Sequence, residues 1–317
     1  MIRNSFSSLK CRPGSIRPLV KSGLLVIGLF GGFQGVSAKC SKYQAAFTVA
    51  KKNQVYQHQN FSQGEEQYFD LFYSGIFVGY GKLEVKEPIQ HAGVWHNVFA
   101  AIANTAPSYE MIFRGSEKMM TYSLPGSFSV SRFKLEQDEE KILGDKYVAQ
   151  KWLKFDHNKC YVKEILLEEG KKQKIRRFDL MPGATDILSS FYQLRTKKFK
   201  LGKKENLLIY TSEKSWWAEA TPQKTEELEV PAGKFKALKV SMKTYIGKVA
   251  EQKGDMFVWL GVEHPSRPIV KIKGEVKIGN IELELRKFVP GQNQLAAVAK
   301  YQLENSNKKQ DKQVGSK

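Results

Sequence analysis

Residues 268–288, with the sequence PIVKIKGEVKIGNIELELRKF, indicate the fold class. Apolar and charged side chains alternate on both sides of a Gly-Asn pair, as they do in strands that have one buried face. Gly-Asn suits a tight two-residue hairpin turn. A register that pairs Ile278 with Ile281 sets apolar side chains opposite one another on one face and Lys277 opposite Glu282 on the other. The stretch therefore predicts an antiparallel β-hairpin.

The same period of two extends over most of the chain. From residue 67 onward, short runs of β-branched and aromatic residues are separated by glycine, proline or charged turns. This pattern predicts a mainly β protein, built as a large curved antiparallel sheet or a barrel-like roll. Among the predicted strands are 108–114, 118–123, 215–220 and 226–230.

Residues 185–196 depart from the strand pattern and predict one short helix. Thr185 or Asp186 suits the N-cap, because a Pro-Gly pair precedes them and apolar residues follow at helical spacing. The apolar stripe consists of Ile187, Leu188, Phe191 and Leu194. We expect this stripe to pack on the sheet.

The N-terminus has the features of an export signal. Basic residues precede a short apolar run at 23–33, which is followed by Val36 and Ala38 at the positions of a small-residue cleavage site. The sequence thus predicts cleavage after Ala38 and a periplasmic protein, with a secreted or outer-membrane-associated protein as alternatives. Lys39 argues against lipidation of Cys40. No later apolar run approaches about 18 residues, so no transmembrane span is expected in the mature chain.

The remaining chain divides by composition into an arm, a core and a tail. We expect an N-terminal arm over 39–64, a β-rich domain over 65–290 and a mobile polar tail over 291–317. The β-rich region is compatible with one large domain or with two lobes, 65–182 and 197–290.

The chain is strongly basic, with a formal charge of +19. Removal of residues 1–38 leaves about +14, which favours anionic partners at long range: an envelope lipid, a glycan or an acidic protein. No segment resembles a nucleic-acid-binding module. The alternative is that the lysines simply keep a β protein soluble. If the C-terminal strands share a sheet, one basic face would contain Lys239, Lys243, Lys271, Lys273 and Lys277.

No catalytic, metal-binding or cofactor-binding motif is evident. The five histidines lack metal-ligand spacing, so we predict neither a metal site nor a cofactor. Cys40 and Cys160 are the two cysteines of the mature chain, and in an oxidising compartment we expect them to form a disulfide.

The helix end and the tryptophans suggest a ligand site. Trp216 and Trp217 are adjacent, so a strand must direct them to opposite faces. Arg195 lies in the last helical turn, where a guanidinium suits carboxylate or phosphate. We therefore predict ligand binding where the helix crosses the sheet, near Arg195, Trp216, Trp217 and Trp259. The alternative is that Arg195 complements the helix C-terminus and the tryptophans are core residues.

Several segments resemble exported bacterial proteins of the family called domain of unknown function 3108. They are FYSGIFVG at 72–79, DILSSFYQLR at 186–195, Gly202, VPAGKF at 230–235, VWL at 258–260, RPI at 267–269 and IG at 278–279. The resemblance implies an exported β-rich sheet of barrel-like or rolled form. It carries no established catalytic residues over to this chain.

These observations predict a non-enzymatic exported binding or accessory protein that handles an anionic or amphiphilic component of the cell envelope. One alternative is an envelope hydrolase or transferase that acts on cell-wall or lipid material. Another is a structural partner of an outer-membrane assembly. An apolar groove rimmed by lysines would favour the binding protein, whereas convergent carboxylates in a cleft would favour the enzyme.

Overall fold

The computed structural model describes residues 60–141, 144, 146–246, 249–250, 256–275 and 279–292. Most of these residues lie in strands, and one α-helix is present among them. The prediction of a mainly β protein with a large curved sheet and one short helix is confirmed. The predicted signal peptide, most of the predicted N-terminal segment 39–64 and most of the predicted polar tail 291–317 lie outside the described residues.

The first half of the chain forms one arm of the sheet. Its elements are β1 (Glu66–Tyr73), β2 (Ile76–Val85), β3 (Ile89–His91), β4 (Val94–Thr105), the 3-10 helix η1 (Pro107–Tyr109), β5 (Phe113–Ser123), β6 (Val130–Lys141), β7 (Tyr147–Asp156), β8 (Tyr161–Glu168) and β9 (Lys174–Asp179). β1, β2 and β4 to β9 pair antiparallel in succession, and β3 adds a small hairpin on β4.

The second half forms the other arm and returns to the first strand. Its elements are β10 (Thr185–Asp186), α2 (Ile187–Thr196), β11 (Glu205–Thr211), β12 (Lys214–Val230), β13 (Gly233–Ile246), β14 (Val249–Ala250), β15 (Met256–Gly261), β16 (Ile269–Glu275) and β17 (Asn280–Val289). β10 runs parallel to β11, and the other pairs are antiparallel. Because β17 pairs with β1, both arms belong to one continuous sheet.

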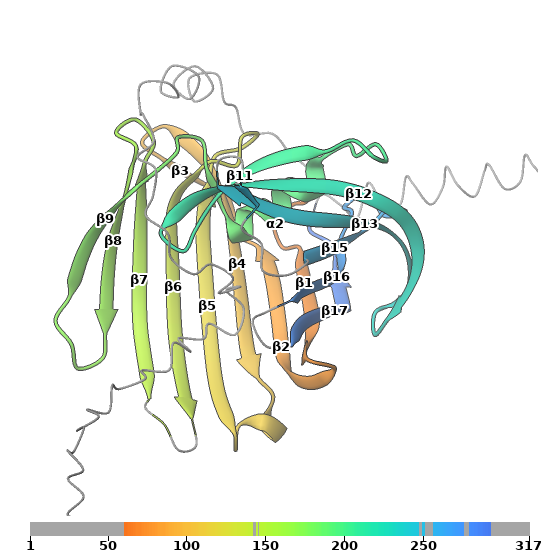
Figure 1. Cartoon of the computed structure of the whole chain (residues 1–317), viewed down its shortest axis with the longest axis horizontal. Coiled ribbons are helices and arrows are strands. Elements are labelled where there is room, and N and C mark those ends of the chain that lie inside the picture. The colour runs from red at the N-terminus through yellow and green to blue at the C-terminus, as the bar shows by residue number, and fades with distance from the viewer. Residues whose placement is uncertain are drawn as a thin grey trace, which may run out of the picture.

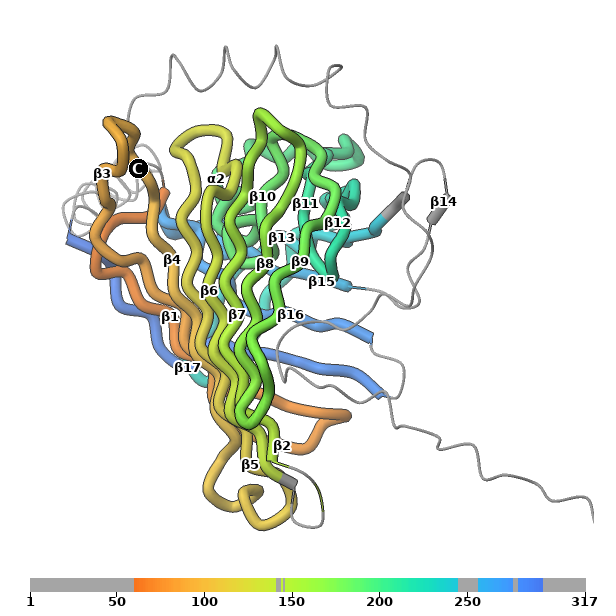
Figure 2. The backbone as a smooth tube through the Cα atoms, turned by 90° about the vertical axis from the view of Figure 1, so that its left-hand side faces the viewer, coloured from red at the N-terminus to blue at the C-terminus, as the bar shows by residue number. Residues whose placement is uncertain are grey.

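The two arms curve around a shared interior that contains α2 (Figures 1 and 2). The helix contacts β4 and β5 of one arm and β10 and β11 of the other. The ring of Tyr192 stacks on Phe99 with centroids 3.9 Å apart, and Phe61 meets both rings edge-on. The helix thereby fills the space between the two arms.

The start of α2 is fixed by a buried cap. Asp186 accepts hydrogen bonds from the backbone N–H groups of Leu188 (2.9 Å) and Ser189 (3.1 Å), which confirms the predicted N-cap. Thr121 on β5 donates a further hydrogen bond of 2.6 Å to the same carboxylate. Asp186 therefore caps the first turn of α2 and also ties the helix to the first arm of the sheet.

Two predicted strand boundaries are wrong. The strand predicted over 108–114 is interrupted by η1, and β5 begins only at Phe113. The strands predicted over 215–220 and 226–230 are one long strand, β12. A β-bulge between Pro222 and Lys224 allows β12 to contain a proline. Proline has no backbone N–H to donate to the neighbouring strand, and a bulge interrupts the hydrogen-bonding ladder at that point.

The predicted turn register of the last hairpin is also wrong. Ile281 pairs with Gly274 rather than with Ile278, and the ladder closes at Glu275 and Asn280. The predicted register would set Glu275 opposite Glu284. The observed register sets Lys271 opposite Glu284, so charge complementarity across the strands outweighs the local preference for a Gly-Asn turn.

Cys160 is disulfide-bonded, and its side chain is buried. The other cysteines of the chain, Cys11 and Cys40, lie outside the described residues. The pairing of Cys160 with Cys40 stays a prediction.

We expect the exported protein to begin at Lys39 and to contain no free thiol. Unreduced protein treated with iodoacetamide should show no added mass by intact mass spectrometry, because we predict that Cys40 and Cys160 are paired, whereas reduction in denaturant should expose both to the reagent. Protein that retains residues 1–38, that carries acyl chains, or that is alkylated without reduction would contradict this expectation.

Candidate ligand-binding sites

A cavity of about 440 Å³ lies between the first arm and the start of α2. Its size falls in the range of about 300–1,000 Å³ that is typical of small-molecule sites. The residues that line it come from β6, β7, β8, the start of α2, β11 and the turn that follows. They are Phe133, Leu135, Lys151, Leu153, Phe155, Glu164, Asp186, Ile187, Tyr210, Thr211, Ser212 and Glu213.

Apolar side chains form much of the cavity wall. Alternation along β6 supplies Phe133 and Leu135, and alternation along β7 supplies Leu153 and Phe155. Ile187, the first residue of α2, adds a fifth apolar side chain. Such a wall suits a hydrocarbon chain.

The charged groups at this cavity compensate one another. Glu164 is 1% exposed, and its carboxylate lies 2.6 Å from the guanidinium of Arg176 and 3.8 Å from the ammonium of Lys151. Arg176 also pairs with Glu213 at 2.7 Å. Burial lowers the pKa of Arg176, but the hydrogen bond that Arg176 donates to Glu164 and the neighbouring carboxylates raise it overall. The ion pairs therefore hold β8, β9 and the β11–β12 turn together.

Tyr210 supplies a polar group of a different kind. Its side chain is 4% exposed and its ring packs edge-on against Phe155, with centroids 5.2 Å apart. The hydroxyl has no hydrogen-bond partner among the described residues. Desolvation by burial raises its pKa, so the hydroxyl stays protonated and able to donate.

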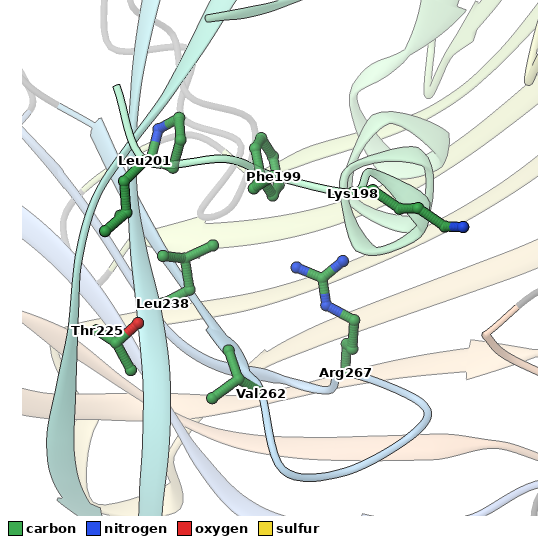
Figure 3. A pocket seen from close by; sticks show the side chains of 8 residues that line it. Lys198, Phe199, Leu201, Thr225, Leu238, Val262 and Arg267 are labelled. Carbon is green, nitrogen blue, oxygen red and sulfur yellow. The ribbon is translucent and has the colours of Figure 1, made fainter. Parts of the chain in front are cut away.

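A second pocket, of about 300 Å³, lies under the loop that leaves α2 (Figure 3). It is lined by Lys198, Phe199, Leu201, Pro222, Thr225, Leu238, Val262 and Arg267. Arg267 donates hydrogen bonds to the carbonyl oxygens of Arg195, at 3.1 Å, and of Lys197. Burial and the charge of Arg195 lower the pKa of Arg267. The lining thus combines an apolar floor with two cations and no carboxylate.

The family assignment follows from residues 68–286, which match the model of a protein family described as protein of unknown function, DUF3108. The chain belongs to DUF3108. No curated protein matches it.

Solved structures with similar folds are distant from this DUF3108 chain. A β-barrel-like DUF1849 protein from Brucella abortus is 10% identical, with a TM-score of 0.46 and coverage of 73% of this chain and 99% of that one. A candidate exported protein with a YmcC-like fold from Bacteroides fragilis is 12% identical (TM-score 0.32, 72% and 97% covered). A candidate lipoprotein from Parabacteroides distasonis is 13% identical (TM-score 0.29, 73% and 98% covered).

Arg195, which the sequence suggested as a ligand donor, is instead an internal anchor. Its side chain is fully buried and forms two hydrogen bonds, of 2.6 and 2.8 Å, with the carboxylate of Glu65. The same guanidinium donates to the carbonyl oxygens of Ser266 and Arg267. Gln67 donates to Glu65 and accepts from the backbone N–H of Ile269, both at 2.9 Å. The guanidinium of Arg195 therefore donates its hydrogen bonds to groups of the protein itself.

The predicted tryptophans do not converge on a described cavity. Trp216 is 1% exposed and donates to the carbonyl oxygen of Thr211, while Trp217 faces the other way and is 39% exposed. Trp259 is buried and donates to Glu226 at 2.7 Å. The prediction that Trp216 and Trp217 occupy opposite faces agrees with these exposures. The site predicted around Arg195 and these tryptophans does not coincide with either cavity above.

The predicted basic face is neutralised at two of its lysines. Lys271 lies 2.8 Å from Glu282 and 2.7 Å from Glu284, and Lys273 lies 2.7 Å from Glu282. Lys239 instead lies over the ring of Phe257, 4.2 Å from its centroid, and over the ring of Trp259.

The remaining members of the predicted face are placed differently. Lys243 is exposed and lines a third pocket, of about 310 Å³, on β12 and β13. Lys277 lies outside the described residues.

The described residues contain neither a metal-binding cluster nor a membrane-spanning helix. No group of three or more His, Cys, Asp or Glu side chains there is arranged to hold a metal ion. Within that part of the chain, no helix has the length and apolar character needed to cross a membrane.

Replacement of Arg195 should strongly destabilise the fold. Arg195→Met removes the cation that pairs with the buried Glu65 carboxylate, and we expect a loss of about 3–5 kcal/mol in the free energy of unfolding by urea. Arg195→Met combined with Glu65→Leu should recover part of that loss. The control is Arg114→Met, which removes an exposed pair with Glu140 and should cost less than about 1 kcal/mol. Equal effects of Arg195→Met and Arg114→Met would rule out the anchoring role.

His264 should make stability depend on pH. Burial lowers the pKa of His264, the Glu65 carboxylate raises it and the Arg195 charge lowers it, for a net decrease. The unfolded chain then binds a proton more readily than the folded protein, so this contribution to stability is present above about pH 6.5 and is lost as pH falls. In the wild-type protein the backbone N–H of Ser266 donates to the His264 ring at 3.1 Å, and His264→Asn keeps an acceptor for that N–H.

The measurement is urea unfolding over a pH series from neutral to acidic. The wild-type protein should lose more stability than His264→Asn over that range. Parallel pH profiles for the two proteins would show that His264 does not contribute.

Proposed function

We propose that this protein is a non-enzymatic exported binding or accessory protein, which holds the apolar part of an amphiphilic envelope component in the 440 Å³ cavity. The observation that carries the proposal is an apolar wall to which Tyr210 also contributes, since its buried hydroxyl has no hydrogen-bond partner among the described residues. Leaving such a group without a partner costs about 1–3 kcal/mol, which a ligand acceptor would offset. A hydrocarbon chain with an oxygen-rich head group meets both requirements.

The carboxylates of this cavity support binding rather than hydrolysis or transfer. Asp186 caps α2 and accepts from Thr121, and Glu164 and Glu213 are both paired with Arg176. General acid or base catalysis needs a carboxyl group that is free to exchange a proton with a substrate. All three carboxylates at this cavity have partners within the protein.

The export signal and the positive charge are consistent with this role. Residues 1–38 have the pattern of a signal cleaved after Ala38, which would place the mature protein in the periplasm. A formal charge of about +14 on the mature chain would concentrate anionic amphiphiles near the protein.

Native mass spectrometry of the protein purified from its own envelope tests the proposal. We expect a co-purified lipid or other amphiphile that is released by organic extraction. A co-purified protein without any amphiphile would instead favour the structural-partner alternative. Turnover of a cell-wall or lipid substrate by the purified protein would favour the enzyme.

Tyr210→Phe should weaken ligand binding without weakening the fold. We expect affinity for cis-parinaric acid, a fluorescent fatty acid, to fall about five- to tenfold, as for the loss of one hydrogen bond. The free energy of unfolding should stay equal or rise, because the variant removes a buried hydroxyl that lacks a partner. Leu153→Trp, which fills the cavity, should abolish binding.

The matched control is Tyr192→Phe. Tyr192 is a second buried tyrosine whose hydroxyl lacks a partner in the described part of the chain, but it does not line the cavity. It should bind cis-parinaric acid with wild-type affinity. Unchanged affinity in both Tyr210→Phe and Leu153→Trp would refute the cavity as the ligand site.

A further inference from the structure

The loop between α2 and β11 concentrates lysine and apolar side chains in one place. Residues 197–204 have the sequence KKFKLGKK, with five lysines, Phe199 and Leu201, and no acidic residue. No other function assigned above uses this loop. Its chemistry combines positive charge with apolar side chains, which suits the interface of a bilayer.

The backbone of this loop presents Leu201 at its tip. The N–H of Lys203 donates to the carbonyl oxygen of Lys200 at 3.0 Å, which closes a turn, and Gly202 takes a φ of 75°. The N–H of Gly202 also donates to the carbonyl oxygen of Pro222, at the bulge of β12. The turn is thus held by the sheet, and the side chain of Leu201 is 67% exposed.

Other apolar side chains extend this tip into a surface. Phe199, Leu201 and Val262 line the same 300 Å³ pocket, and Val262 is itself 38% exposed. Figure 3 shows Phe199 and Leu201 on the loop with Val262 and Arg267 across the pocket from them. An exposed leucine beside an apolar pocket is unfavourable in water and favourable in acyl chains.

The charge of this loop is not neutralised within the described residues. Lys198, Lys200 and Lys203 are exposed and have no acidic group within ion-pair distance in the described part of the chain. The lysines at the two ends of the loop are held, Lys197 by Glu205 at 3.6 Å and Lys204 by Glu219 at 3.0 Å. Three cations therefore surround Leu201 and remain available to external anions.

We propose that loop 197–204 docks the protein on the surface of a bilayer that contains anionic phosphate head groups. Lys198, Lys200 and Lys203 contact the phosphates, and Leu201 inserts among the acyl chains beside the pocket. Charge complementarity selects the anionic surface, and the apolar tip selects a bilayer over an acidic protein. This inference goes beyond the proposed function, because no residue lines both this pocket and the 440 Å³ cavity.

Vesicle co-sedimentation of the exported protein tests the proposal. We expect binding to vesicles of phosphatidylglycerol and phosphatidylcholine, and none to phosphatidylcholine alone. Each lysine near an anionic surface is worth about fivefold in partitioning, so the triple variant K198Q/K200Q/K203Q should bind on the order of 100-fold more weakly. Leu201→Asn should reduce binding about tenfold, and added salt should weaken binding by the wild-type protein.

The controls separate a local site from general basicity. K118Q/K159Q/K172Q removes the same charge from three exposed lysines elsewhere, and Ile112→Asn removes an apolar loop residue that is 58% exposed. Both should keep most of the binding, and all variants should retain the wild-type melting temperature. Leu153→Trp should bind vesicles normally, which separates this proposal from ligand binding in the cavity.

Three results would overturn the proposal. One is equal loss of binding in the two triple variants, which would indicate non-specific attraction. Another is wild-type binding by Leu201→Asn. The third is a K198Q/K200Q/K203Q variant that still binds vesicles but no longer binds an acidic protein.

Discussion

The arrangement of the two arms depends on one buried ion pair, Arg195 with Glu65. Both side chains are essentially inaccessible, 0% and 1% exposed, so each charge has lost its hydration. Such a pair is tolerable only when further hydrogen bonds satisfy the remaining donors and acceptors. The carbonyl oxygens of Ser266 and Arg267, together with Gln67, provide them. The pair therefore joins the end of α2 to the start of β1 and to the loop before β16, where the two arms of the sheet meet.

An anchor at the end of the helix also determines where the two candidate sites lie. Asp186 fixes the first turn of α2 against β5, and this end of the helix contributes Ile187 to the wall of the 440 Å³ cavity. Arg195 fixes the last turn, and the chain leaves it as the lysine-rich loop over the 300 Å³ pocket. Arg267 donates to the carbonyl oxygens of Arg195 and Lys197, so the same network positions the wall of that pocket. One helix thus separates an apolar cavity from a basic surface loop.

Local patterns in the sequence identify most of the elements but not their long-range partners. Alternation identifies strands, and the Asp186 cap with its apolar stripe identifies α2, because both signals depend on neighbouring residues. The register of β16 and β17 and the passage of β12 through Pro222 depend on charges and bulges supplied by another strand. The function of Arg195 depends on Glu65, 130 residues earlier, and no local spacing reveals that partner. The walls of the larger cavity likewise come from five separate segments, so Tyr210 gave no signal of its own.

The placement of positive charge shows why composition alone was a weak guide to binding. A formal charge of +19 describes the whole chain and does not say which cations are free to meet a partner. On β16, Lys271 and Lys273 lie beside Glu282 and Glu284, because antiparallel pairing brings the acidic strand next to the basic one. A loop has no facing strand, so Lys198, Lys200 and Lys203 are not neutralised in this way. Lys271 and Lys273 therefore stabilise the sheet, whereas Lys198, Lys200 and Lys203 remain available for recognition beside the exposed Leu201.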